Sequence, residues 1–143
     1  DRVIAVDNSP AMLKRARQTA HEEALQQIEF IEGSTEQLIP NQKYSFDAIV
    51  MNMVLHHVPS PDLLIRDCEQ LLRPGGMLFI SELNEHQQSW ARESCGDVWL
   101  GFKGEQLSQW ANKAGLRNGE NIFIGVRNGF QVQLRQFIKP GQQ

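Results

Sequence analysis

Several classes of protein are excluded by what this sequence of 143 residues lacks. No window approaches the roughly 18 consecutive apolar residues of a membrane-spanning helix, and the first residues do not read as a signal peptide. The two cysteines, Cys68 and Cys95, are too few for a disulfide framework and fit no CxxC or zinc pattern. We therefore expect a cytoplasmic, reduced setting and no membrane partner.

The sequence is also poor in positive charge and in biased segments. The formal net charge is −3, the isoelectric point is about 5.8, and no basic run is longer than the cluster at residues 14–17. That balance argues against direct nucleic-acid binding by this domain. With 41% hydrophobic residues, 22% charged residues and no low-complexity stretch, the composition is that of one globular domain.

Strands and helices are predicted to alternate in the first third of the chain. Residues 3–6 form an apolar run that ends at Asp7, as expected of a buried parallel strand. Ser9 then caps a helix whose first residue is Pro10. Residues 28–32 are the next strand, and the polar residues 33–43 are expected to be a loop.

The stretch from residue 44 to residue 82 carries the strongest α/β signal. A buried strand is predicted at residues 46–51, followed by a polar edge at residues 52–57 and a helix that starts at Ser60-Pro61. Residues 73–76 stop this helix in a sharp turn, and residues 77–83 form another buried strand. In such folds ligands bind at the carboxyl ends of the strands, so the polar edge is the place to expect one.

The last part of the chain predicts a helix and a hairpin. Residues 105–114 are amphipathic, and Asn128-Gly129 separates two alternating runs at residues 122–127 and 130–138. The fold class is therefore α/β, with a doubly wound, mostly parallel sheet and a C-terminal antiparallel hairpin.

Three motifs in this order resemble the class I S-adenosylmethionine-dependent methyltransferases. They are VIAVDNSPAMLKRAR at residues 3–17, IEFIEGSTEQLIP at 28–40, and FDAIVMNMVLHHVPSPDLLIRDCEQLLRPGGMLFISE at 46–82. The resemblance implies a Rossmann-like methyltransferase fold, S-adenosylmethionine as the cofactor and methyl transfer as the activity.

The resemblance places one part of the cofactor site after the first strand. Asp7 would accept hydrogen bonds from the ribose hydroxyls, because a carboxylate just past a strand end can accept from both. Asn8 and Met12 would flank the adenosine. The alternative for Asp7 is a cap or a helix-dipole partner ahead of Pro10.

A second part would follow the next strand, at Gly33, Ser34 and Thr35. The family usually has an aspartate where this chain has Ser34, so a hydroxyl replaces the charge that would meet the adenine amino group. The backbone of Thr35 could still hold the ring. The alternative is a turn that merely ends the strand.

A third part would be formed by Asn52, Met53, Val54 and His57, which line the pocket after the strand at residues 46–51. One histidine of the pair His56-His57 is a candidate base near the sulfonium, and a packed histidine is the alternative. Neighbouring side chains point differently, so no metal-ligand set is visible and no metal is expected.

The family's first strand and its glycine-rich loop have no counterpart in this sequence. We therefore interpret residues 1–143 as a single methyltransferase-like domain that is incomplete at its N-terminus and holds half of the cofactor site. The missing strand would lie in the middle of the sheet. We expect residues 1–143 alone to fold poorly and to bind cofactor weakly, because unpaired buried backbone groups cost about 1–3 kcal/mol each.

Two functions remain open. The first is methyl transfer to a small-molecule acceptor, as in free-standing enzymes of the quinone-biosynthesis type, with Trp90, Trp99 and Phe102 either shaping the acceptor pocket or packing in the core. The second is a cofactor-binding or degenerate regulatory domain behind a winged-helix repressor of the arsenic-repressor type, which DVWLGFKGEQLSQWANKAGL at residues 97–116 resembles. The sequence leaves the oligomeric state open, with a homodimer among the alternatives.

Overall fold

The structure, a computed structural model, describes residues 2–86, 98–125 and 130–141. These residues form two compact units, Asp1–Pro40 and Asn41–Gln143. Each unit is described by itself below, and the prediction of a single, N-terminally incomplete domain stays a prediction.

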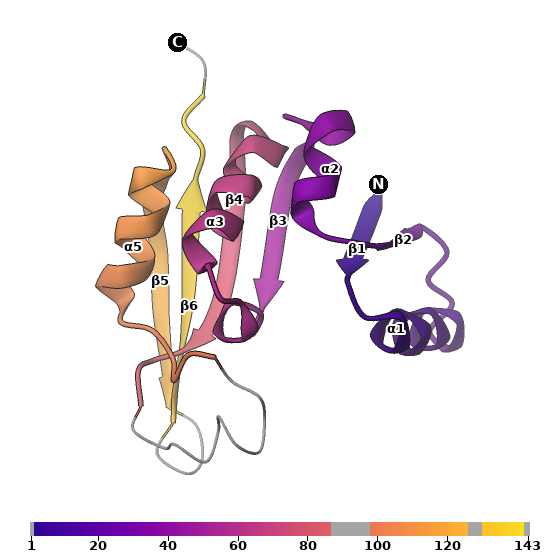
Figure 1. Cartoon of the computed structure of the whole chain (residues 1–143), viewed down its shortest axis with the longest axis horizontal. Helices are drawn as coiled ribbons and strands as arrows, with labels where there is room; N and C mark the ends of the chain where they lie inside the picture. The colour runs from indigo at the N-terminus through magenta and orange to yellow at the C-terminus, as the bar shows by residue number, and fades with distance from the viewer. Residues whose placement is uncertain (1, 87–97, 126–129, 142–143) are drawn as a thin grey trace. The chain divides into compact units, whose positions relative to one another are not determined.

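The first unit contains the parallel strands β1 (Val3–Asp7) and β2 (Ile28–Glu32), joined by helix α1 (Pro10–Glu22) (Figure 1). Helix α1 begins as predicted: the Ser9 hydroxyl accepts a hydrogen bond from the Met12 backbone N–H at 3.3 Å, and Pro10 is the first helical residue. The strand–helix–strand prediction for this part of the chain is confirmed.

The loop predicted at residues 33–43 is wrong, because this segment contains helix α2 (Thr35–Gln42). Glu36 lies in its first turn, where a negative charge is favoured by the helix dipole. Pro40 lies inside the helix and removes one backbone hydrogen-bond donor. This short helix, which buries none of its residues, tolerates that loss. Polar composition and one proline were therefore not enough to exclude a short helix.

The second unit has a four-stranded sheet in the order β3-β4-β6-β5 (Figure 1). Its strands are β3 (Phe46–Asn52), β4 (Leu72–Leu83), β5 (Arg117–Gly125) and β6 (Gln131–Ile138). The pair β3–β4 is parallel, whereas β4–β6 and β5–β6 are antiparallel. The predicted C-terminal hairpin is therefore confirmed, although its turn at Asn128-Gly129 lies outside the described residues.

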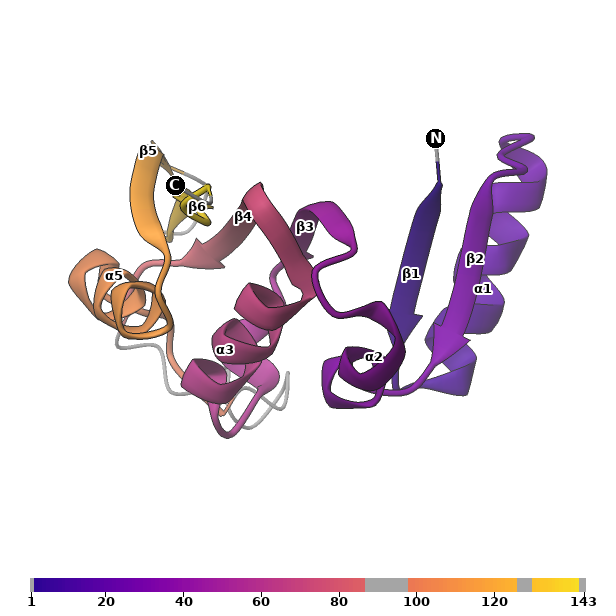
Figure 2. The ribbon, with the colours of Figure 1, turned by 90° about the horizontal axis from the view of Figure 1, so that it is seen from above.

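The described residues of this unit also include the helical segments η1 (Leu55–His57), α3 (Pro61–Leu71) and α5 (Gly104–Lys113). Helices α3 and α5 contact each other and cover the same face of the four-stranded sheet (Figure 2). Helix α3 starts at Pro61 as predicted, but Ser60 makes no capping hydrogen bond with its side chain.

The turn predicted at residues 73–76 is partly wrong. Helix α3 ends at Leu71, and extended chain follows directly in β4, so that Phe46 pairs with Leu72 and Ala48 with Met77. The residues between these two pairs form an irregularity in the ladder, and Gly75 adopts a φ of 84° there. The sequence Arg-Pro-Gly-Gly thus bends a strand that has already begun.

The core of the second unit lies between the sheet and the helices α3 and α5. It contains Met51, Leu55, Ile65, Cys68, Leu72, Leu78, Ile80, Phe102, Leu107, Ala111, Leu116 and Phe137. Cys68 is completely buried, and burial raises the pKa of its thiol to about 12, so the thiol keeps its proton at neutral pH.

The strands β1 and β3 each have a hydrogen-bonded neighbour on one side only within the described parts of the chain. Val50 of β3 is 72% exposed and Val3 of β1 is 50% exposed. Open edges with exposed apolar side chains are what the expectation of a further central strand requires. That strand itself stays a prediction.

Candidate functional site

Asp7 is the last residue of β1, at the carboxyl end of a parallel strand. One of its carboxylate oxygens, Oδ1, accepts the Ser9 backbone N–H at 2.8 Å, and its carbonyl accepts Gly33 N–H at 3.0 Å. Asp7 therefore makes a local contact just ahead of helix α1, near the position that the alternative interpretation gave it, although the N-cap residue is Ser9. The described residues offer no partner to the second carboxylate oxygen, which leaves it available to a ligand hydroxyl.

The remaining predicted residues of the first unit lie beside this turn or after β2. Asn8 and Met12 are exposed, and Met12 is in the first turn of α1. Gly33 follows β2, Ser34 is exposed, and Thr35 begins α2. The Ser34 backbone N–H donates to Gln37 Oε1 at 3.1 Å, so this backbone donor is already engaged.

The residue that follows β3, Met53, has an unusual backbone conformation. Met53 has a φ of 57°, which is rare for a residue with a side chain, and its N–H donates to the Ser81 carbonyl at 2.9 Å. The Ser81 hydroxyl donates to Asn52 Oδ1, which joins the ends of β3 and β4. Positive φ at a non-glycine residue often marks a functional position, and here it occurs inside the polar edge at residues 52–57, where a ligand is predicted to bind.

The two adjacent histidines have different environments. His56 is buried with 6% of its surface exposed, whereas His57 is exposed and its ring centroid lies 4.0 Å from that of His56. Val54, two residues before His56, is 39% exposed. The packed alternative therefore describes His56, and His57 is the histidine that a ligand could reach.

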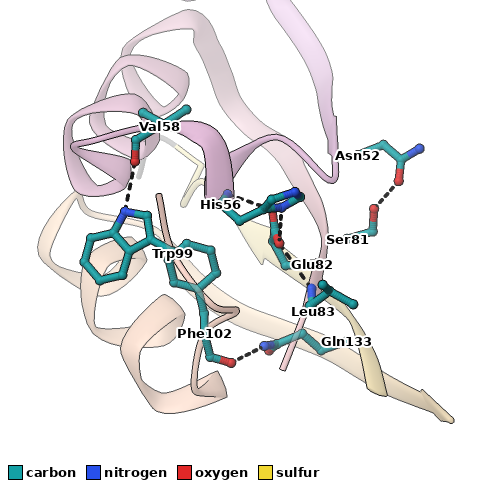
Figure 3. A network of polar contacts seen from close by, with 9 residues as sticks. All are labelled: Asn52, His56, Val58, Ser81, Glu82, Leu83, Trp99, Phe102 and Gln133. Carbon is teal, nitrogen blue, oxygen red and sulfur yellow. Dashed lines mark hydrogen bonds and ion pairs between the residues drawn. The ribbon is translucent and has the colours of Figure 1, made fainter. Parts of the chain in front are cut away.

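A buried carboxylate holds His56 (Figure 3). His56 Nδ1 lies 2.9 Å from both Glu82 carboxylate oxygens, and the His56 backbone N–H donates to Glu82 Oε1 at 3.1 Å. Glu82 Oε2 also accepts the Leu83 N–H at 3.1 Å. A carboxylate only accepts hydrogen bonds, so Nδ1 is the protonated ring nitrogen. Glu82 is fully buried, and these four contacts satisfy it.

Further contacts fix the segment around His56 from the opposite side (Figure 3). The His56 carbonyl accepts the backbone N–H groups of Val98 and Trp99, at 2.9 and 3.0 Å. The Trp99 indole N–H donates to the Val58 carbonyl at 2.9 Å. The chain from Asn52 to Val58 is thus tied to β4 through Glu82 and to the segment around Trp99.

The aromatic residues predicted as either pocket or core are core residues where they are described. Phe102 is completely buried, and Trp99 packs against the core beside Phe102 and Trp110. Trp90 lies outside the described residues.

Glu82 is the site residue that the sequence interpretation missed. It was named only as the last residue of a motif. Its position near the end of an apolar strand was nevertheless a signal, because a buried carboxylate needs a hydrogen-bonding partner. The partner, His56, is 26 positions earlier and could not be identified without the strand register.

The predicted site residues are thus brought together in two groups, one per unit. Asp7, Asn8, Met12, Gly33, Ser34 and Thr35 gather at the carboxyl ends of β1 and β2, whereas Asn52 ends β3 and Met53, Val54 and His57 come after it. In each unit taken by itself, polar groups thus lie at the carboxyl ends of parallel strands, which is where α/β folds bind ligands. Among the described residues, no three His, Cys, Asp or Glu side chains form a metal-binding group, and no helix is long and apolar enough to cross a membrane.

Comparison with known proteins identifies the family. Residues 1–80 match the family described as "Methyltransferase domain". The ubiquinone biosynthesis O-methyltransferases of Xanthomonas axonopodis pv. citri and Xanthomonas euvesicatoria pv. vesicatoria are 34% and 33% identical to this chain over 128 residues, covering 80% of it and 53% of each relative. The chain thus spans about half the length of the curated relatives it matches.

Solved structures agree on the fold. A candidate methyltransferase of Bacillus halodurans C-125 superposes with a TM-score of 0.85 at 16% identity, covering 98% of this chain and 84% of its own. The N-methyltransferase NodS of Bradyrhizobium japonicum WM9, solved with S-adenosyl-L-homocysteine, has a TM-score of 0.76 at 21% identity, with 97% and 67% coverage. The [4+2]-cyclase SpnF has a TM-score of 0.82 at 17% identity, with 99% and 67% coverage. These likenesses confirm a Rossmann-like α/β fold with a C-terminal hairpin, and together with the family match they show that the chain belongs to the class I S-adenosylmethionine-dependent methyltransferases.

Proposed function

We propose that this protein transfers a methyl group from S-adenosylmethionine to an oxygen atom of a small-molecule acceptor. The observation that carries this proposal is the identity of 34% over 128 residues with an O-methyltransferase. The described geometry supports it, because polar residues follow the carboxyl ends of β1, β2 and β3, where α/β folds bind ligands.

We assign the cofactor contacts to the predicted residues. When bound, S-adenosylmethionine supplies an electrophilic methyl group on a positively charged sulfur. Asp7 would bind the ribose hydroxyls through its available oxygen, with Asn8 and Met12 beside the adenosine. Gly33, Ser34 and Thr35 would border the adenine ring. These residues bind and orient, which is the main contribution a protein makes to such a displacement.

We assign further cofactor contacts to the second unit. Asn52 ends β3, Met53, Val54 and His57 come after it, and Glu82 fixes this segment through His56. His57 is exposed and is our candidate for accepting the proton of the acceptor hydroxyl. A positioned segment matters here, because misplacing reacting groups by about 1 Å can cost about 100-fold in rate.

The alternative of a regulatory domain receives no support from the relatives reported above. A regulatory domain would differ from an enzyme by binding the cofactor without transferring its methyl group. The fold alone does not decide this point, since a cyclase also has it.

The test uses the intact protein in two steps. Titration with S-adenosylhomocysteine measures cofactor binding, and incubation with S-adenosylmethionine and a panel of hydroxylated aromatic acceptors measures methyl transfer. We expect saturable binding and O-methylated products. Absence of binding would contradict the cofactor assignment, whereas binding without product on every acceptor would contradict the enzymatic proposal alone.

A further inference from the structure

Two buried cations lie four residues apart, Arg135 within β6 and Lys139 just after it, and within the described parts of the chain only Lys139 has a counter-charge. Lys139 Nζ is 3.1 Å from Glu69 Oε1 and donates to the carbonyls of Glu69 and Leu72 at 2.8 and 2.9 Å. An ammonium has three donors, so this cation is fully satisfied.

Arg135, four residues earlier, is equally buried but differently partnered. Its Nη2 donates to the Ser108 hydroxyl and, at 3.4 Å, to the Gly104 carbonyl. Within the described parts of the chain no carboxylate lies within ion-pair distance of Arg135, and its Nη1 and Nε have no hydrogen-bond partner. Burial lowers the pKa of Arg135, as expected where no nearby negative charge replaces the lost hydration.

Arg135 lines an open groove of about 580 Å³ between helix α5 and strand β5. The groove is otherwise lined mainly by hydroxyl and amide side chains, namely those of Ser108, Gln109, Asn112 and Asn118. Phe123 adds an aromatic ring, and among the described lining residues Glu105 is the one carboxylate. Glu105 makes no ion pair with Arg135, so a buried cation without a counter-charge faces a mostly polar groove and can recognise an anion.

Glycine at position 104 keeps the guanidinium accessible. A Cβ atom at this position would lie 3.1 Å from Arg135 Nη1. Any larger side chain would crowd the nitrogen that has no hydrogen-bond partner.

We propose that this groove binds a small molecule through an oxyanion, a carboxylate or a phosphate, paired with Arg135. A guanidinium offers parallel N–H donors that match either group. The amide and hydroxyl side chains on α5 and β5 then bind neighbouring polar atoms of the ligand. The groove is separate from the edge that follows β3, since β4 and β6 lie between β3 and β5 in the sheet.

The test titrates the ¹⁵N-labelled intact protein with inorganic phosphate and, separately, with acetate, at constant ionic strength. We expect saturable shifts of the amide signals of Ser108, Asn112, Asn118 and Arg135, and the more strongly bound anion identifies the ligand class. Arg135→Gln should lose at least about tenfold in affinity, because it removes a charge-assisted pair. Arg117→Gln removes the same charge from an exposed position on β5 and should leave the affinity unchanged.

A second variant decides the matter if Arg135→Gln does not fold. Ser108→Asp places a carboxylate beside Arg135 Nη2, the nitrogen that donates to the Ser108 hydroxyl. The new ion pair should raise the melting temperature and abolish phosphate and acetate binding. The proposal is wrong if neither anion shifts these signals, if Arg135→Gln binds as well as Arg117→Gln, or if Ser108→Asp binds like the unmodified protein. None of these readouts depends on cofactor binding or methyl transfer.

Discussion

Two pairs of side chains lie at opposite ends of strand β4, and they hold different parts of the chain: His56–Glu82 is at its carboxyl end, and Lys139–Glu69 is beside its first residue, Leu72. At its carboxyl end Glu82 binds both the ring and the backbone of His56, in the segment that borders the proposed pocket. At its other end Lys139 binds Glu69 and two backbone carbonyls at the end of helix α3, beneath the ring of Tyr44. The same chemistry therefore positions a candidate site in one region and fastens a helix to the sheet in the other.

The difference lies in what each pair would leave behind when broken. The side chain of Glu82 is completely buried and that of His56 is 8% exposed, whereas the side chain of Glu69 is 25% exposed. Water therefore reaches Glu69 of the Lys139 pair more readily than either partner of the Glu82 pair. The His56–Glu82 pair should therefore be the more costly of the two to break, and it alone should affect ligand binding.

The largest effect is expected for Glu82→Ala. Removing one partner of a buried pair costs about 3–5 kcal/mol, and here it also removes the carboxylate that accepts the backbone N–H of His56 and contacts its ring Nδ1. Urea unfolding measures the loss. Glu82→Gln keeps the size and one acceptor oxygen, so it should lose less stability; a loss below about 1 kcal/mol for the alanine variant would contradict the account.

Lys139→Met is expected to come next. It removes the ion pair and two hydrogen bonds but keeps the apolar stem, so we expect a loss of about 1–3 kcal/mol by urea unfolding. Affinity for S-adenosylhomocysteine should stay within about twofold of the unmodified protein, by isothermal titration. If Lys139→Met weakened S-adenosylhomocysteine binding as much as Glu82→Gln does, the Lys139 pair would also position the cofactor site, and the two pairs would not differ in role.

The sequence predicted the elements on both sides of this comparison but not the pairs themselves. Ser9-Pro10 and the alternating runs of the C-terminal hairpin are local signals, and they correctly placed α1 and the β5–β6 pair. The pairs that join His56 to Glu82 and Lys139 to Glu69 depend on strand register and helix packing, which no local pattern encodes. Helix α2 was missed for the opposite reason, because it buries no residue that would reveal its period.

Asp7→Asn extends the comparison to a carboxylate that is only partly buried. It keeps an oxygen for the Ser9 N–H, so the free energy of unfolding should change by less than about 1 kcal/mol. Affinity for S-adenosylhomocysteine should fall by about tenfold or more, because hydrogen bonds to a charged acceptor are lost. Binding equal to that of the unmodified protein would show that Asp7 serves only the local turn.

The smallest effect at neutral pH concerns Cys68, which is buried in the core of the same unit. Its pKa is raised from 9.0 to about 12, so the folded thiol keeps its proton where the unfolded thiol loses it. Stability should therefore be unaffected below pH 9 and fall above it, by about 1.4 kcal/mol per pH unit at most from this group. In a Cys95→Ser background, the additional loss relative to Cys95→Ser/Cys68→Ala measures this contribution, and equal pH dependence of the two proteins would contradict it.

We infer that Glu82 positions the segment that follows β3, at residues 53–57, whereas Lys139 does not. The most direct test compares the affinities of Glu82→Gln and Lys139→Met for S-adenosylhomocysteine, measured by isothermal titration on intact proteins shown to be folded by circular dichroism. The account predicts a loss of about tenfold or more for Glu82→Gln and little change for Lys139→Met. Equal affinities in the two variants would contradict it.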